Sequence, residues 1–148
     1  MSRFLQTTFC DDIRQEVGGK ISLIGVYNGV LYVPQFPATL PKLWLMTTLV
    51  MPYKEPPRQM KIRVMKDSEA LVDLDATEEY LRQLANPPEP VVPTPSGGQR
   101  VLTSHAQVCF SPLVINEPCV LRVIATTDQG EVRGLGLQIQ QQSAVVAA

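Results

Sequence analysis

The 148-residue sequence lacks the features that mark several classes of protein. Thirteen Lys and Arg stand against fourteen Asp and Glu, and neither sign gathers into a run that would follow a phosphate backbone or an anionic membrane. The longest apolar stretch, 43–51, is shorter than the roughly 20 residues that a membrane-spanning helix needs. Polar residues interrupt the N-terminus before a signal-peptide core could form. We therefore expect a soluble, cytoplasmic protein that has no membrane span and no nucleic-acid partner.

Cysteine and histidine are also scarce. The three cysteines, Cys10, Cys109 and Cys119, form no C-x-x-C pair, which favours reduced thiols in the core, although Cys109 and Cys119 could pair on neighbouring strands. The single histidine, His105, stands four residues before Cys109, which is about 13 Å along a strand, so it cannot activate that thiol. We expect no metal and no cofactor.

Helical periodicity is nearly absent, and apolar residues mostly alternate with polar ones. Met60, Ile62 and Val64, for example, are separated by Lys61 and Arg63. This pattern predicts an all-β fold, mainly an antiparallel β-sandwich of the Ig-like or C2-like kind with about eight strands. The expected strands are 3–10, 20–26, 29–33, 42–51, 59–66, 69–75, 101–110, 119–127 and 132–140.

The remainder divides into one helix, one loop and a tail within a single domain, 1–148. Residues 76–85 predict a short helix capped by Thr77. Prolines and glycines crowd 86–100, which predicts a surface loop, and 141–148 is expected to be a flexible tail. Pro90 and Pro93 have the P-x-x-P spacing of a polyproline ligand, but no basic residue flanks them closely, so a connector is the better interpretation.

A charged stretch near the N-terminus is the strongest candidate for a functional feature. It is no phosphate loop, because Lys20 is followed by Ile21 and an apolar β run. Gly18 and Gly19 suit a turn with positive φ. We expect a structural corner between two strands, in which Arg14 pairs with a neighbouring carboxylate. The candidate residues for this corner or binding surface are Cys10, Asp11, Asp12, Arg14, Glu16, Gly19 and Lys20.

Two other functions stay open beside a binding or assembly module. A small hydrolase would need Asp11, Glu16 and His105 to converge in one cleft. A calcium-dependent lipid-binding domain would need several oxygen ligands at one end of the sandwich. Its candidate ligands are Asp73, Asp75 and Asp128.

One predicted strand, 42–51, is apolar on both faces. Trp44, Met46 and Val50 would place a large apolar surface on the face that a sandwich normally leaves to solvent. Either a second subunit covers it, which makes the protein a homo-oligomer or the binder of a protein partner, or residues 76–99 form a lid.

The stretch "FCDDIRQEVGGKISLIGVY", followed by "LPKLWLMTTL", resembles an uncharacterised family of small bacterial and prophage proteins, a domain of unknown function. The resemblance implies no catalytic residue. It does favour treating the charged residues of 10–20, together with Gly25, as one local constellation that serves as a folding corner or a binding surface.

Overall fold

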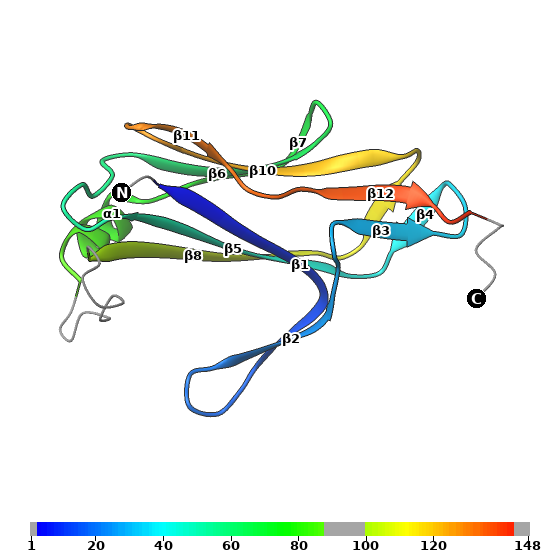
Figure 1. Cartoon of the computed structure of the whole chain (residues 1–148), viewed down its shortest axis with the longest axis horizontal. Coiled ribbons are helices and arrows are strands. Elements are labelled where there is room, and N and C mark those ends of the chain that lie inside the picture. Colours follow the sequence, from blue (N-terminus) through cyan, green and yellow to red (C-terminus); the bar gives the residue numbers. More distant parts are fainter. Residues whose placement is uncertain (1–2, 88–99, 144–148) are drawn as a thin grey trace.

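Two β-sheets lie face to face in the computed structural model, which describes residues 3–87 and 100–143 (Figure 1). The sheet that we call sheet A has the order β2 (Ile21–Val26), β1 (Phe4–Gln15), β5 (Leu43–Pro52) and β8 (Val101–Phe110). All of its pairs are antiparallel. The expected all-β sandwich with one short helix is thus confirmed.

Sheet B forms the second layer. Its order is β3 (Val30–Val33), β12 (Leu137–Gln141), β10 (Cys119–Thr127), β6 (Met60–Lys66) and β7 (Glu69–Asp75), and β11 (Gly130–Arg133) also pairs with β10. The β3–β12 pair is parallel, whereas the other pairs are antiparallel. A small ladder joins β4 (Ala38–Leu40) to β9 (Leu113–Ile115) at one end of the sandwich.

The described residues form more strands than the sequence predicts, partly because the run expected at 132–140 is split. β11 ends at Arg133 and β12 begins at Leu137, yet both pair with β10. In the gap between them, the backbone carbonyl of Leu135 accepts a hydrogen bond from the Thr7 hydroxyl. This bond ties β1 of sheet A to sheet B, so the break closes one side of the sandwich.

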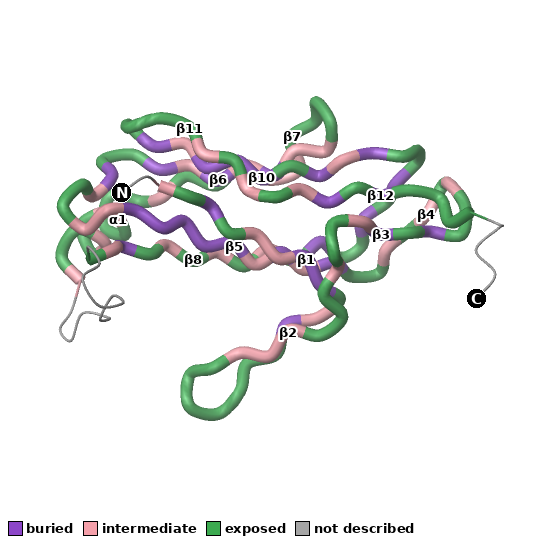
Figure 2. The backbone as a smooth tube through the Cα atoms, viewed as in Figure 1, coloured by how far each residue is buried: buried purple, intermediate pink, exposed green. Residues whose placement is uncertain are grey.

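The core lies between the sheets, where alternate residues of the central strands meet (Figure 2). On β5 the inward side chains Leu43, Leu45, Leu49 and Met51 are almost fully buried. Each such side chain contributes about 1.5–3 kcal/mol relative to an exposed one. The predicted alternation on β6 is confirmed, because Met60, Ile62 and Val64 are all buried.

The helix α1 (Glu78–Ala85) connects the two layers. Its predicted cap is confirmed, because the hydroxyl of Thr77 accepts a hydrogen bond from the Tyr80 amide at 3.1 Å. Leu81 and Leu84 pack against the core, and the Tyr80 hydroxyl lies 2.7 Å from the Ser104 hydroxyl on β8. The expected loop at 86–100 lies largely outside the described residues, as does most of the expected tail. No helix within the described ranges has the length and apolar character that crossing a membrane requires.

The cysteines are only partly as expected. All three are free thiols, and Cys10 and Cys119 are buried. Cys109, however, is exposed, so the expectation that it is a core residue is wrong. Cys109 lies on β8 of sheet A and Cys119 on β10 of sheet B, which means that the two are not on neighbouring strands.

Candidate functional site

The charged N-terminal stretch forms a β-hairpin that leaves the two layers and runs below them (Figure 1). We call residues 10–26 the arm. Its turn is closed by the Glu16 amide, which donates to the Lys20 carbonyl at 2.8 Å. Gly18 and Gly19 have φ of +88° and +76°, as the turn requires. The turn therefore lies at 16–20, whereas 10–15 continue β1 beyond the residue at which the strand was expected to end.

The base of the arm is held by Asp11 and Tyr27. The Tyr27 hydroxyl donates to the Asp11 carboxylate, and the Tyr27 amide donates to the Phe9 carbonyl at 2.8 Å. Burial, and then the bond to Asp11, raise the pKa of Tyr27 to about 12. Gly25, on the opposite strand, has φ of +68°, and a Cβ there would lie 2.8 Å from Asp11 Cγ. Asp11, Gly25 and Tyr27 thus form one interlocked contact.

Asp12 fastens the same region to the body. Its carboxylate lies 2.9 Å from the ammonium of Lys42, just before β5, and 3.4 Å from Arg14 Nε. The hydrogen bond from Lys42 is the main reason that the pKa of Asp12 falls below its ordinary value. The expected pairing of Arg14 with a neighbouring carboxylate is present. Because this pair is exposed to solvent, it adds little to stability and serves mainly to position the arm.

Further along, the arm reaches the outer face of sheet A. Gln15 donates to the side chain of Gln107 on β8 at 3.5 Å. Ile13 is only 8% exposed, and Cys10, which is paired in register with Trp44, is fully buried. Burial raises the pKa of the Cys10 thiol. The first part of the arm is therefore packed on its own chain.

These contacts show what lies over the apolar outer face of β5. The sequence predicts that a second subunit or a lid formed by 76–99 covers this face. Val50 is buried within the single chain, while Trp44 and Met46 are half-buried. The arm, which the sequence did not suggest as a cover, lies on this side of sheet A, whereas α1 packs against the core. An open hollow of about 340 Å³ remains beside β1 and β5. Its lining includes Gln6, Thr8, Met46 and Thr48.

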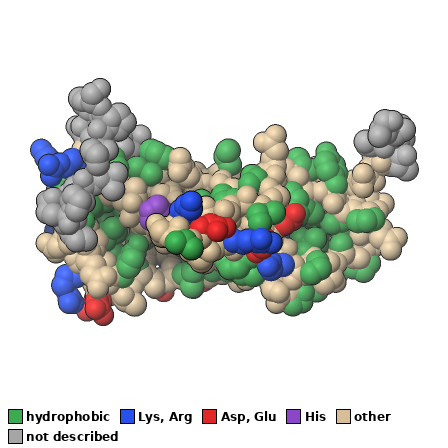
Figure 3. Space-filling model, turned by 90° about the horizontal axis from the view of Figure 1, so that it is seen from below, with side chains coloured by type: hydrophobic (Ala, Val, Ile, Leu, Met, Phe, Trp, Pro, Cys, Tyr) green, Lys and Arg blue, Asp and Glu red, His purple; other side chains and the backbone are tan. Residues whose placement is uncertain are grey.

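The outward side of the arm carries apolar side chains. Ile24 is 40% and Val26 56% exposed, and Asp12 stands opposite Ile24 in the ladder with β1. Figure 3 shows this face, on which basic and acidic side chains lie close together with hydrophobic ones among them. The arm therefore combines a packed base with an amphipathic surface that faces solvent.

The groups that a hydrolase would need do not converge. Asp11 lies on β1 and Glu16 directly follows the end of that strand, which separates their backbones by about 16 Å. Asp11 binds Tyr27 at the base, whereas Glu16 begins the turn. His105 lies on β8, where its Nδ1 is 3.0 Å from the Thr48 hydroxyl. Asp11 therefore lies away from Glu16, and the Asp11 carboxylate and the His105 ring are each engaged with a different partner.

The aspartates proposed for calcium are separated as well. Asp73 and Asp75 lie 3.4 and 3.8 Å from the Lys61 ammonium, whereas Asp128 accepts the Arg58 and Gln59 amides at 2.7 and 3.3 Å. The first of those amide bonds is the main reason that the pKa of Asp128 is lowered. Nowhere in 3–87 or 100–143 do three His, Cys, Asp or Glu side chains lie close enough to hold a metal ion.

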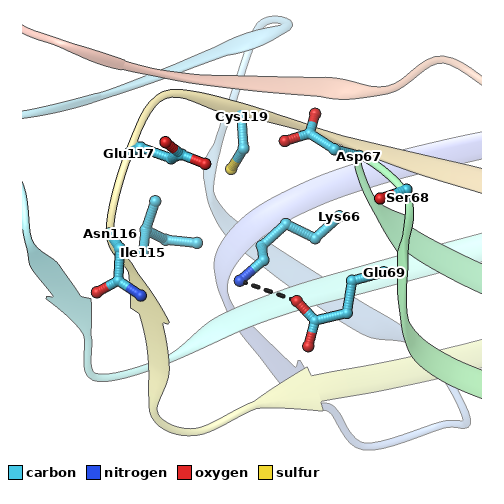
Figure 4. Close-up of a pocket in the computed structure, with 8 residues that line it drawn as sticks. All are labelled: Lys66, Asp67, Ser68, Glu69, Ile115, Asn116, Glu117 and Cys119. Atoms are coloured by element: carbon cyan, nitrogen blue, oxygen red, sulfur yellow. Dashed lines mark ion pairs between the residues drawn. The ribbon is translucent and has the colours of Figure 1, made fainter.

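A hollow of about 240 Å³ at the β6–β7 turn contains the remaining buried thiol, Cys119 (Figure 4). Lys66 points to Glu69, and their charged atoms are 3.3 Å apart. Burial, followed by the nearby charge of Asp67, raises the pKa of Cys119. A catalytic cysteine needs its pKa lowered, so this environment opposes nucleophilic chemistry.

Sequence reasoning missed Tyr27, Lys42 and Gln107 as partners of the arm. Tyr27 could have been found, because a hairpin centred on Gly18 places Gly25 opposite Asp11 and brings Tyr27 to the same end. Lys42 and Gln107 carry no such signal, because their contacts depend on how β1 bends relative to β5 and β8.

Comparison with known proteins gives one finding. Neither the curated proteins nor the solved structures contain a match to the chain. A family model does match, and it covers residues 5–140, which include both sheets, the helix and the arm. The chain therefore belongs to the family described as "Family of unknown function (DUF6941)".

Proposed function

We propose that the protein is a non-enzymatic assembly module, in which copies of the chain associate through the outer side of sheet A. The observation that carries this proposal is an anchored arm with an apolar outward side. Ile24 and Val26 are branched apolar residues on a strand that no second strand flanks on its outer edge within the described residues. Such surfaces are typical of protein interfaces.

The chemistry of the rest of the chain supports a role without catalysis. The carboxylates of Asp11, Asp12 and Asp128 are engaged in local contacts that hold segments together. Cys10 and Cys119 have raised pKa values, so both thiols stay protonated at neutral pH. Because all three thiols are free, we also propose a reducing compartment such as the cytoplasm.

A second copy is the partner that the charges of the arm favour. Arg14 and Lys20 alternate along the arm with Asp12 and Glu16, so two arms that meet in opposite directions can place unlike charges opposite each other. The net charge of −1 per chain adds little repulsion between copies. Trp44 and Met46 extend this surface onto the sheet.

The native mass in solution tests the proposal. Light scattering at micromolar concentration should give a multiple of 16.4 kDa. The double variant Ile24→Glu/Val26→Glu should weaken association, because desolvating two carboxylates opposes burial. A matched control, Leu74→Glu/Val114→Glu, changes two apolar residues that are each 48% exposed and lie away from the arm. It should leave the mass unchanged.

A native mass of 16.4 kDa would reject the assembly role. If the native mass is unchanged in Ile24→Glu/Val26→Glu as well as in the control, the arm is not the contact between copies. Trp44→Glu is less informative than these variants. Because Trp44 is half-buried within the single chain, the substitution would place a carboxylate in a partly desolvated site even in a monomer.

A further inference from the structure

We infer that two copies join edge to edge through β8, so that sheet A continues across the contact as one antiparallel sheet. This inference rests on the proposed assembly role and adds a second contact to it, the edge of β8, which the arm reaches through the bond of Gln15 to Gln107. β8 is the last strand of sheet A, and no strand of the described residues pairs with its outer edge. The helix α1 reaches β8 through the Tyr80 side chain, which meets the Ser104 hydroxyl.

The composition of β8 carries the inference. Open edge strands expose unpaired backbone groups, and proteins usually protect them with charged side chains, proline, bulges or short length. β8 is 10 residues long and has no charged residue, proline or glycine. It pairs with β5 over its whole length without a shift of register. The residues of β8 therefore supply none of the protection that a strand's own sequence or register can give.

The open strand edges of sheet B in the described residues do show such protection. β7 carries Glu69, Asp73 and Asp75, and its pairing with β6 has a register shift. β3 has only 4 residues and is followed by Pro34. β11 also has 4 residues, and it carries Glu131 and Arg133. The contrast indicates that the edge of β8 is left open for pairing.

The inner side of β8 is also incompletely covered. Ser104, Ala106 and Val108 are only half-buried, whereas the inward residues Leu45 and Leu49 of the adjacent β5 are fully buried. A further strand beside β8 would place its own inward side chains next to these three. It would remove more of the Val108 side chain from water.

A second β8 fits the edge better than a foreign strand of unknown charge. An antiparallel strand can pair with its own copy about a two-fold axis, which places each side chain near an equivalent one. Charged residues near that axis would oppose like charges, and β8 has none. Two neutral strands of 10 residues therefore pair without this penalty.

The ladder with β5 identifies the backbone groups that are available. The Tyr53 amide donates to the Arg100 carbonyl at 3.0 Å, directly before β8 begins. Because bonded positions alternate in an antiparallel ladder, the even-numbered residues 102–110 bond to β5. The odd-numbered residues direct their amides and carbonyls to the open edge, and they are Val101, Thr103, His105, Gln107 and Cys109.

This alternation allows a sharp test. Gln107→Pro removes an outward amide without removing a bond to β5, so each chain should keep its fold. The variant should halve the native mass measured by light scattering and weaken association at least about tenfold, because the two-fold axis doubles every lost bond. Gln107→Thr loses the same side chain but keeps the amide, so it should retain the native mass. Asp73→Pro on the edge of β7 should retain it too.

Hydrogen exchange tests the same joint without a substitution. In the native oligomer, the amides of Thr103, His105 and Gln107 should be protected as well as those of their even-numbered neighbours. Dilution below the association range should restore fast exchange at the odd positions alone. A native oligomer whose odd amides exchange quickly, or whose mass survives Gln107→Pro, would overturn the β8 joint and leave the assembly role standing. A native mass of 16.4 kDa would reject both.

Discussion

Gly25→Ala offers the most direct test of how the arm is anchored. Gly25 adopts φ of +68°, and a Cβ at this position would lie 2.8 Å from Asp11 Cγ and 3.1 Å from Asp11 Cβ. The added methyl group must therefore displace the Asp11 side chain from the Tyr27 hydroxyl that donates to it. The substitution combines backbone strain with the loss of a charge-assisted hydrogen bond.

Gly18→Ala is the matched control. Gly18 has φ of +88°, but nothing lies within 4 Å of a Cβ placed there. A left-handed backbone costs an ordinary residue about 1–2 kcal/mol, and the lower entropy of the unfolded chain returns about 0.4–1 kcal/mol. The control should therefore lower the free energy of unfolding by about 1 kcal/mol.

The difference between the two variants isolates the Asp11 contact. A hydrogen bond to a charged group is worth about 1.5–3 kcal/mol, and the exposure of Asp11 favours the lower end. Gly25→Ala should thus cost about 1.5 kcal/mol more than Gly18→Ala. For a chain of this length the extra loss corresponds to a melting temperature about 3–6 °C lower.

Urea denaturation followed by circular dichroism provides the measurement, and an Asp11→Ala background closes a double-mutant cycle. Without the Asp11 carboxylate, Gly25→Ala should cost about as much as the control. Equal losses for Gly25→Ala and Gly18→Ala would refute the interlocked contact. So would a full loss that persists in the Asp11→Ala background.

Three further outcomes follow from the titratable groups. The pKa of Tyr27 is raised to about 12, so the stability that Tyr27 contributes to the fold is complete below the ordinary tyrosine pKa and is lost as pH rises through about 12. The free energy of unfolding of Tyr27→Phe should therefore fall less than that of the wild type between pH 10 and 12. The pKa of Asp12 is lowered, so the stability that its carboxylate contributes is present above the ordinary aspartate pKa and is lost as pH falls through the lowered value. Asp12→Asn should therefore make the free energy of unfolding less dependent on pH in acid. An unchanged dependence would contradict the Lys42 contact. Of the three free thiols, exposed Cys109 should react first with a thiol reagent, and buried Cys10 and Cys119 only after urea is added; rapid reaction of more than one thiol would contradict the burial.

Period-two alternation predicted which residues share a face, but it did not predict whether that face is covered. On β6 the apolar face is buried, as expected from Met60, Ile62 and Val64. On β7 the same pattern leaves Leu74 48% exposed, because β7 is an edge strand and its pairing with β6 shifts in register. Coverage depends on neighbours in space, which alternation within one strand does not contain.

The arm shows a similar limit at the candidate site. The turn glycines and the Arg14 pairing were predictable because both depend on residues within the hairpin. The attachment of the arm was not predictable, because its partners lie elsewhere in the chain. Lys42 directly precedes β5, and Gln107 lies on β8. The sequence reveals the apolar outer face of β5, but it points to a second subunit or to 76–99 as the cover and not to the hairpin that precedes β5.

The edge of β8 combines both kinds of information. Its lack of charge is visible in the sequence at 101–110, where it would suit a buried central strand equally well. Only the strand order places it at the boundary of sheet A, where neutrality becomes a liability for a monomer. A chain that protects β7 with three carboxylates yet leaves β8 bare has edges of two kinds. That asymmetry is expected if one edge faces solvent and the other faces a second copy.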